Sequence, residues 1–329
     1  MNNSNSGRSA RGLSVVAAFL AGCGAPQAPL GAAGSTPLQA QARAASAAAT
    51  IPVGRPALEG LEHKATAPLL YVSNDGDQHD ITVYRAGAKD PSPIGTISND
   101  LEQPVGICLD GQGTLYVVDV DGWVAEYPAG KTKPSKVITK GINTPAYCAI
   151  DSKGNLWVTN IGGPNVTEYL QGSTKPHSVI TKGLTYPDGI AIDHSGNIYV
   201  GNGGYDSSSY NVVVYPPGGK SPSRTITDGV AFPVGMTVDA HDTLYLANDD
   251  SNNVEEYRSG QNHPYQTITD DLDYPVAVTV DKNGRLYVTN EGNYEVLEFA
   301  PGSITPSDRQ ISKGLLDPWG TAYSPPLLP

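Results

Sequence analysis

The strongest constraint on the fold of this 329-residue chain is a short segment that recurs six times. The copies are LLYVSN (69–74), TLYVVD (114–119), NLWVTN (155–160), NIYVGN (197–202), TLYLAN (243–248) and RLYVTN (285–290). Each copy is apolar, rich in β-branched and aromatic residues, and ends in Asn or Asp, which is typical of a strand that runs into a turn. The recurrence predicts a repeat architecture built from one supersecondary unit.

Three further strands are expected in each unit. One begins upstream at a proline, namely Pro104, Pro145, Pro187, Pro233, Pro275 or Pro318, at intervals of 41, 42, 46, 42 and 43 residues. An Asp-x-x-Gly turn or a close variant follows it, opened by Asp110, Asp151, Asp193, Asp239 or Asp281. A third strand ends in Tyr84, Tyr127, Tyr169, Tyr215, Tyr257 or Phe299, and a fourth follows, as in KVIT (136–139), SVIT (178–181) and RTIT (224–227). Four short strands per unit of about 42 residues predict a β-propeller blade.

The two ends of the repeat complement each other. The first unit has no proline-initiated strand before residue 69, and PWGTAY (318–323) is such a strand without a blade of its own. The sequence therefore predicts an all-β, six-bladed β-propeller over residues 66–329, closed by the C-terminal strand, which completes the first blade and leaves no open edge.

The recurring pattern resembles NHL-repeat propellers, and it is similar to the six-bladed gluconolactonases and senescence marker proteins. The resemblance covers residues 66 to 324. It implies the six-bladed fold, but such blades carry hydrolases, lyases and pure binding proteins, so the fold leaves the activity open.

The N-terminal region predicts a cellular address. Residues 1–22 contain Arg8 and Arg11, the short apolar stretch 12–20, and then Leu20-Ala21-Gly22 before Cys23. This stretch has the length of a signal-peptide core, and the four residues LAGC resemble a bacterial lipoprotein signal, which implies lipidation of Cys23. The alternative is an ordinary secretory signal with an incidental cysteine. Residues 23–65 then predict a disordered tether rich in Ala, Pro and Gln, which anchors the propeller to a membrane of the bacterial cell envelope, facing the periplasm or the exterior.

Charge divides the two faces of the predicted propeller. The net charge of −12 argues against a nucleic-acid partner. The loops after each LYV strand and before each proline lie on one face, and that face is strongly acidic: Asp75, Asp77, Asp80, Asp100, Glu102, Asp119, Asp121, Asp206, Asp249, Asp250, Asp270, Asp271, Asp273 and Glu291. It either attracts a cationic or basic partner or is a solubilising surface.

One blade carries the candidate ligand site. The residue after each proline is expected at the channel mouth, where Val105, Ala146, Val234, Val276 and Trp319 are apolar and Asp188 is a carboxylate. The same blade has the longest acidic-face loop, 203–211. The expected ligand-binding residues are Asp188, Asn202, Tyr205, Asp206 and Tyr210, and the alternative is a tolerated surface insertion.

The resemblance also implies a metal alternative. Asp188, in PDGIAID (187–193), looks like the aspartate that binds the catalytic metal in gluconolactonases, although their glutamate and asparagine ligands are matched here by valine, alanine and tryptophan. A lone hydrogen-bonded aspartate is the other interpretation of Asp188.

Two recurrent features are expected to be structural. The strand-end residues Asn74, Asp119, Asn160, Asn202, Asn248 and Asn290 are expected to cap turns through side-chain hydrogen bonds. Cys108 and Cys148 fall on innermost strands of neighbouring blades, one residue out of phase, and are expected to be buried free thiols rather than a disulfide.

The functional hypothesis is an exported, lipid-anchored, monomeric and non-catalytic binding or scaffold module. Its acidic face would bind a protein, peptide or glycan with no cofactor, and its contact with the membrane would run through the lipid alone. The alternative is a metal-dependent, gluconolactonase-like hydrolase centred on Asp188 that uses Ca²⁺ or Zn²⁺.

Overall fold

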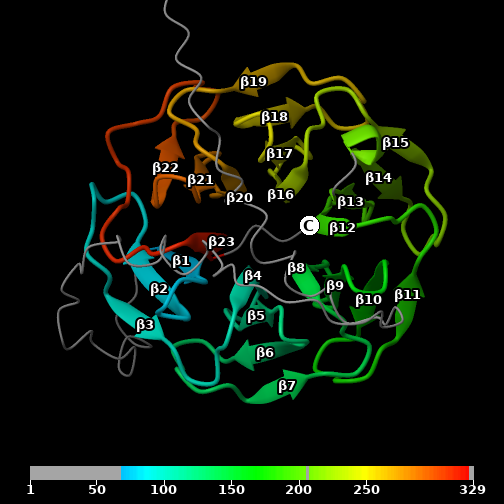
Figure 1. Ribbon diagram of the computed structural model, residues 1–329, viewed down its shortest axis with the longest axis horizontal. Helices are drawn as coiled ribbons and strands as arrows, with labels where there is room; N and C mark the ends of the chain where they lie inside the picture. The colour runs from blue at the N-terminus through cyan, green and yellow to red at the C-terminus, as the bar shows by residue number, and fades with distance from the viewer. Residues whose placement is uncertain (1–67, 205–206, 326–329) are drawn as a thin grey trace, which may run out of the picture. The chain divides into compact units, whose positions relative to one another are not determined.

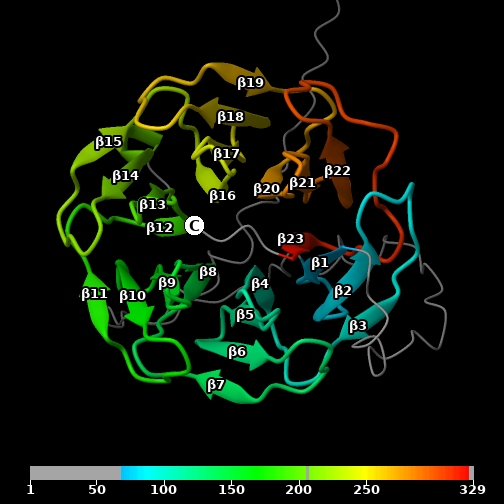
Figure 2. The same cartoon turned by 180° about the vertical axis from the view of Figure 1, so that it is seen from behind.

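The computed structural model describes residues 68–204 and 207–325. These residues form six antiparallel sheets arranged in a ring around a central axis, with the chain visiting the sheets in order (Figure 1). Figure 2 shows the same ring from behind. The predicted all-β, six-bladed propeller is therefore confirmed. Cys23, the expected signal peptide and the tether lie outside the described residues.

The blades are numbered from the N-terminus, and within each the strands are given from the axis outward. Blade 1 has β23 (Pro318–Ser324), β1 (Leu69–Asn74), β2 (Asp80–Arg85) and β3 (Gly95–Ile97). Blade 2 has β4 (Pro104–Leu109), β5 (Leu115–Asp119), β6 (Trp123–Tyr127) and β7 (Lys136–Ile138). Blade 3 has β8 (Pro145–Ile150), β9 (Leu156–Asn160), β10 (Asn165–Tyr169) and β11 (Ser178–Ile180).

Blade 4 has β12 (Pro187–Ile192), β13 (Ile198–Asn202), β14 (Asn211–Tyr215) and β15 (Arg224–Ile226), with the single helical turn η4 (Ser207–Ser209) before β14. Blade 5 has β16 (Pro233–Val238), β17 (Leu244–Asn248), β18 (Asn253–Tyr257) and β19 (Gln266–Ile268). Blade 6 has β20 (Pro275–Val280), β21 (Leu286–Asn290) and β22 (Glu295–Phe299). Nothing helical in the described parts of the chain is long and apolar enough to span a bilayer.

Tyrosines explain how neighbouring blades are joined. In blades 1 to 5 a fully buried tyrosine lies near or at the end of the third strand, and its hydroxyl donates a hydrogen bond to a backbone carbonyl in the segment that enters its blade. In blade 4, for example, Tyr215 donates to the carbonyl of Lys182 at 2.8 Å. Tyr84, Tyr127, Tyr169 and Tyr257 make the equivalent bonds to Lys313, Asn99, Lys140 and Asp228. Tyrosine thus supplies apolar area for the core and a polar atom that fixes the inter-blade connection.

The turn aspartates are also structural. In blade 4, Oδ1 of Asp193 accepts the backbone N–H of Asn197 at 2.8 Å, and Oδ2 accepts the hydroxyl of Tyr199 at 3.1 Å. In blade 3, Asp151 holds Asn155 N and the indole N–H of Trp157 in the same way. The Asp-x-x-Gly turn and the aromatic residue of the LYV strand therefore form one hydrogen-bonded unit.

Glycines let the innermost strands of adjacent blades approach closely. A Cβ on Gly189 would lie 1.9 Å from the carbonyl oxygen of Val234 in the next blade, and one on Gly106 would lie 2.6 Å from Cα of Tyr147. Side chains larger than hydrogen do not fit at these contacts. Neighbouring blades are thus packed backbone against backbone around the axis.

This close approach overturns the free-thiol expectation. Cys108 on β4 and Cys148 on β8 form a disulfide, with their Cα atoms 5.8 Å apart. The expectation assumed that innermost strands diverge around the channel, but the glycine contact at Gly106 brings β4 against β8 just before the cysteines.

The ring closes as predicted. β23 pairs antiparallel with β1, from Leu69 with Ser324 to Asn74 with Pro318. Blade 6 departs from the prediction of a fourth strand, because its outer segment makes only the isolated bridges Phe299 with Pro306 and Val296 with Ile311. The path from Ser307 to Ile311 is one residue longer than its counterpart from Ser135 to Ile138, and an extra residue interrupts a ladder as a bulge does.

Candidate functional site

Strand-end side chains organise the loops at one end of the ring. Oδ1 of Asn74, Asn160, Asn202 and Asn248 each accepts a backbone N–H from the segment that enters the same blade, at 2.9–3.0 Å. Asp119 accepts the N–H groups of Glu102 and Gln103 in the same manner. The predicted capping role is confirmed for these five residues.

Both polar atoms of the Asn202 side chain are engaged in hydrogen bonds within the protein. Its Oδ1 accepts from Thr185 and Tyr186, and its Nδ2 donates to the carbonyl of Gly183 and to Oδ1 of Asn211. The residue has no exposed surface. It therefore has no free amide atom for a ligand, and it supports the site from within blade 4 rather than lining it.

The next residue along the chain occupies an equivalent place in every blade. Its backbone N–H donates to the carbonyl of the residue that precedes the blade's proline, as Asp249 does to Phe232 at 3.1 Å. The six residues in this ring are Asp75, Val120, Ile161, Gly203, Asp249 and Glu291. Blades 5, 6 and 1 thus present a carboxylate at one end of the ring. We call Asp75, Asp188, Asp249, Glu291 and Asp317 together the acidic rim.

Asp188 and Asp249 form one part of the acidic rim. Their side chains belong to blades 4 and 5, and only 7% and 8% of the respective residue surfaces are exposed. Burial, with a contribution from the charge of Asp249, raises the pKa of Asp188 to about 8. Burial and the charge of Asp250 raise the pKa of Asp249 to about 7. Two carboxyl groups close together in a region of low dielectric oppose each other's ionisation.

Tyr147 lies beside this pair. It projects from β8 of blade 3, and its hydroxyl donates to the carbonyl of Val276 in blade 6 at 2.7 Å, across the ring axis (Figure 1). Burial and the charges of Asp188 and Asp249 raise the pKa of Tyr147 well above its usual range. The hydroxyl therefore stays protonated, and its hydrogen bond to Val276 holds the Tyr147 side chain near the two carboxyls.

Glu291, Asp317 and Asp75 form the other part of the acidic rim. The carboxyl groups of Glu291 and Asp317 share a hydrogen bond, and burial followed by the charge of Asp317 raises the pKa of Glu291 to about 8. Burial and the charges of Asp317, Asp119 and Asp121 raise the pKa of Asp75 to about 7. His79 Nδ1 lies 4.0 Å from Oδ1 of Asp75.

Lysine and arginine do not compensate the charge of the acidic rim in the part of the chain that the structure describes. Within residues 68–204 and 207–325, no Lys or Arg forms an ion pair with any of its five carboxyl groups. Oδ1 of Asp75 and Oδ1 of Asp249 are buried without a hydrogen-bond partner. Buried carboxylate oxygens of this kind are costly unless a donor reaches them.

The blade 4 loop is only partly described. Tyr210 donates a hydrogen bond to Oδ2 of Asp250 at 3.0 Å, and its ring meets that of Phe232 edge-on at 5.6 Å. Tyr210 thus contacts blade 5. The two other residues expected to form the ligand lip, Tyr205 and Asp206, lie outside the described residues.

A metal does not fit the donors around Asp188. The described part of the chain contains no group of three or more His, Cys, Asp or Glu side chains placed to hold a metal ion. The positions equivalent to Asp188 carry Val105, Ala146, Val234, Val276 and Trp319. The described residues around Asp188 therefore do not supply the several ligands that a divalent metal ion requires.

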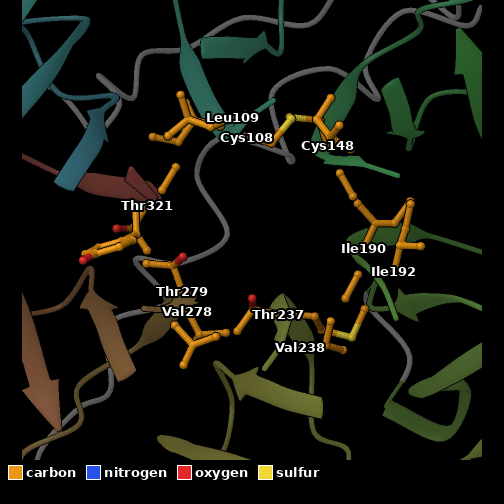
Figure 3. A pocket seen from close by; sticks show the side chains of 18 residues that line it. Cys108, Leu109, Cys148, Ile190, Ile192, Thr237, Val238, Val278, Thr279 and Thr321 are labelled. Carbon is orange, nitrogen blue, oxygen red and sulfur yellow. A yellow bond between two sulfur atoms is a disulfide. The ribbon is translucent and has the colours of Figure 1, made fainter. Parts of the chain in front are cut away.

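The half of the axis away from the acidic rim is lined by uncharged side chains. An open cavity of about 130 Å³ is lined there by the second halves of the innermost strands. Figure 3 shows Cys108, Cys148, Thr237, Thr279 and Thr321 around it. Its lining contains no carboxylate or cationic side chain, so the charged chemistry of the axis lies at the acidic rim.

Sequence reasoning found Asp188 but did not assemble the rest of the acidic rim. Asp75, Asp249 and Glu291 were expected on the acidic face, without being placed around the axis. The signal that marks them is their position directly after the strand-end Asn in three of the six repeats.

Comparisons with known proteins support the fold. No protein-family model matches the sequence, and no curated protein matches it. Among solved structures, a chain of the nidogen/laminin complex is 18% identical, with a TM-score of 0.67 over 78% of this chain and 98% of that one. A protein of unknown function from Bacteroides caccae is 13% identical, with a TM-score of 0.63 over 78% and 99%. Hydrazine synthase of Kuenenia stuttgartiensis is 16% identical, with a TM-score of 0.53 over 67% and 70%. At these identities the likeness shows the propeller fold alone.

Proposed function

We propose that the protein is a non-catalytic binding module whose acidic rim receives a positively charged group. The observation that carries the proposal is the pair of buried oxygens without a hydrogen-bond partner, Asp75 Oδ1 and Asp249 Oδ1, among five carboxyls that no described Lys or Arg pairs with. A bound cation would supply the missing donor and would favour ionised carboxylates.

The rigid scaffold suits this role. Asp75, Asp249 and Glu291 sit at equivalent places in their blades and are held by backbone hydrogen bonds such as Asp75 N to Asp317 O at 3.0 Å. A ligand would therefore meet carboxylates that need little rearrangement, which reduces the entropic cost of binding. Asp188 and Asp249 would contact the ligand, while Asn202 and Asn248 would hold the backbone of blades 4 and 5 around them.

The experiment measures binding of spermidine to the full chain by calorimetry at low ionic strength. We expect binding that strengthens from pH 6 to pH 8.5, since the carboxyls must lose their protons to pair with the cation. Asp249→Asn and Asp188→Asn should each weaken binding at least tenfold, whereas Asp270→Asn, an exposed carboxylate of the same face, should change it little. Equal affinity in all four proteins would reject the acidic rim as the site.

We further propose that the module is exported and held in the bacterial envelope by lipid on Cys23. The segment Leu20 to Cys23 and the disulfide between Cys108 and Cys148 support this address, because disulfides persist in oxidising compartments. Cys23→Ala should abolish lipid labelling and release the protein from the membrane fraction. Labelling that persists in the variant would contradict the address.

A further inference from the structure

A cavity of about 280 Å³ lies between blades 3 and 4, which are neighbours in the ring (Figure 1). Its lining includes residues of the Asp-x-x-Gly turns of both blades, so it opens at the end of the ring opposite the acidic rim. Trp157 on β9, Glu168 on β10 and Ser178 on β11 pair in register across blade 3, and all three line the cavity. One row of blade 3 thus forms a wall of this space.

This row differs from its counterparts in the residue opposite the glutamate. In blades 2, 5 and 6 the equivalent glutamate has a partner on the outer segment of its blade. The pairs are Glu126 with Lys136 at 3.1 Å, Glu256 with Gln266 at 3.0 Å and Glu298 with Arg309 at 3.6 Å. In blade 3 the small Ser178 takes the place of Lys136 and Gln266. Within the described residues, the Glu168 carboxyl makes no hydrogen bond or ion pair.

A second cavity gives an internal comparison. It lies at the equivalent place between blades 5 and 6 and measures about 290 Å³. Tyr245, the counterpart of Trp157, lines it, but Glu256 does not, and the Glu256 carboxyl accepts hydrogen bonds from Tyr265 and Gln266. An inter-blade cavity therefore recurs at this end of the ring, whereas the cavity beside blade 3 adds a carboxyl that no described donor reaches.

The charges of the lining are balanced. The charged lining residues are Asp151, Lys153, Glu168 and Lys220. Two are anionic and two are cationic, and His194, which also lines the cavity, is paired with Asp242 at 2.7 Å. Burial raises the pKa of Glu168, the charge of Asp151 adds to this rise, and the charges of His177 and the two lysines oppose it. Both lysines thus act on the same carboxyl, and a ligand with a net charge would gain little from this lining.

A neutral ligand with several hydroxyl groups fits such a lining. Each hydroxyl both donates and accepts, so one can donate to Glu168 while others accept from Lys153 and Lys220. Trp157 stands where the five other blades have tyrosine, and it offers a larger apolar surface. Its indole N–H already donates to Asp151 at 3.2 Å, so the ring contributes apolar contact rather than a free donor. A sugar ring combines hydroxyl groups with an apolar C–H face.

We infer that the cavity between blades 3 and 4 binds one neutral sugar residue, with Glu168, Lys153 and Lys220 on its hydroxyl groups and Trp157 on its apolar face. This site is separate from the acidic rim and does not depend on cation binding there. Two sources share this chemistry, namely a free monosaccharide and the terminal residue of a glycan.

The test titrates D-glucose, D-galactose, D-mannose and N-acetyl-D-glucosamine into the full chain, with binding measured by saturation-transfer NMR. We expect at least one of them to bind with a dissociation constant on the order of 1 mM, which is ordinary for so small a ligand. Inorganic phosphate, which is an anion, and glycine betaine, which is a zwitterion without hydroxyl groups, should not displace the bound sugar at equal concentration.

Variants test whether the sugar occupies this cavity. Ser178→Lys rebuilds in blade 3 the pair that Lys136 and Glu126 make in blade 2, so the protein should fold and its sugar affinity should fall by at least about tenfold. Glu168→Gln keeps the shape of the side chain but removes its charge, and it should weaken binding roughly fivefold. The matched control is Gln266→Lys, which places a lysine on the equivalent row of blade 5 and should leave the affinity unchanged. Melting temperatures report whether each variant is folded.

The outcomes decide this inference separately from the proposed function, which the spermidine titration tests. If none of the four sugars binds, or if folded Ser178→Lys and Glu168→Gln both bind as tightly as the wild type, the inference is wrong. Displacement of the sugar by phosphate or glycine betaine would also overturn it. If the methyl glycoside of the preferred sugar binds within a few-fold of the free sugar, the inference holds with a glycan terminus as the source. If only the free sugar binds, it holds with a monosaccharide as the source.

Discussion

At the scale of residues, the acidic rim links the stability of the fold to pH. Asp188 and Glu291 have pKa values of about 8, and Asp75 and Asp249 of about 7. In an unfolded chain such groups ionise near pH ~4. Between these limits the folded protein holds more protons than the unfolded one, so the free energy of unfolding falls as pH rises.

This decrease in the free energy of unfolding with pH gives a prediction for the ligand-free protein. The melting temperature should decrease steadily from pH 5 to pH 8.5 at constant ionic strength, as scanning calorimetry would measure. Asp249→Asn should flatten the decrease because it removes one of the groups that must ionise. Asp270→Asn should follow the wild-type slope, and a melting temperature that increases over this range would contradict the raised pKa values.

The same scale shows what a single sequence can and cannot reveal. Asp188 was identifiable because its five counterparts after the prolines are apolar. Asp249 and Glu291 were harder to assign, because a residue after a strand can face solvent or the axis and only the assembled ring decides. The disulfide was missed because the inter-strand approach depends on a glycine contact at Gly106, which spacing along the chain does not show.

At the scale of elements, one tyrosine hydroxyl in each of blades 1 to 5 joins the third strand to the segment that enters the blade. Tyr215→Phe removes the donor to Lys182 and leaves the ring packed. We expect a loss of about 1 kcal/mol in the free energy of unfolding, measured by urea denaturation, because the variant leaves one backbone carbonyl without this donor. Phe299 already occupies this position in blade 6, so the variant should fold.

A control sharpens this prediction. Tyr274→Phe alters a tyrosine that is only partly buried and should change stability by less than about 0.5 kcal/mol. If Tyr215→Phe is as mild as this control, the hydroxyl does not stabilise the inter-blade connection.

Elements were the most predictable level of this protein. The LYV strands, the proline-initiated strands and the Asp-x-x-Gly turns recur, so each copy supports the interpretation of the others. The fourth strand of blade 6 was predicted wrongly because the repeat is irregular there. The additional residue between Ser307 and Ile311 was visible in the sequence, but its effect on the ladder depends on strand pairing.

At the scale of the whole molecule, the disulfide joins blades 2 and 3. It links residues 40 positions apart, and restricting such a loop in the unfolded chain stabilises the native state by about 2–4 kcal/mol. Reduction should therefore lower the urea midpoint, and the double variant Cys108→Ser/Cys148→Ser should match the reduced protein. Titration that finds two free thiols in the unreduced, denatured protein, beyond any at Cys23, would contradict the bridge.

Closure of the ring makes the strongest prediction at this scale. β23 is the innermost strand of blade 1, and it also contacts its neighbours on both sides. The ring of Tyr323 stacks on that of Tyr287 in blade 6 at 5.9 Å, and a Cβ on Gly320 would lie 2.4 Å from the carbonyl oxygen of Val105 in blade 2. Truncation before Pro318 removes these contacts and exposes the edge of β1. We expect the free energy of unfolding to fall by several kcal/mol and unfolding to stop being a single cooperative transition.

The matched control for this truncation is a chain cut after Ser324, which keeps β23 complete and should melt like the full protein. A synthetic peptide of residues 318–324 added to the shorter truncation should restore part of the lost melting temperature, because it can pair with β1 in the register from Leu69 with Ser324 to Asn74 with Pro318. Equal melting of the two truncated chains would show that the propeller is stable as an open ring, and the C-terminal strand would then be an accessory rather than the closure of the fold.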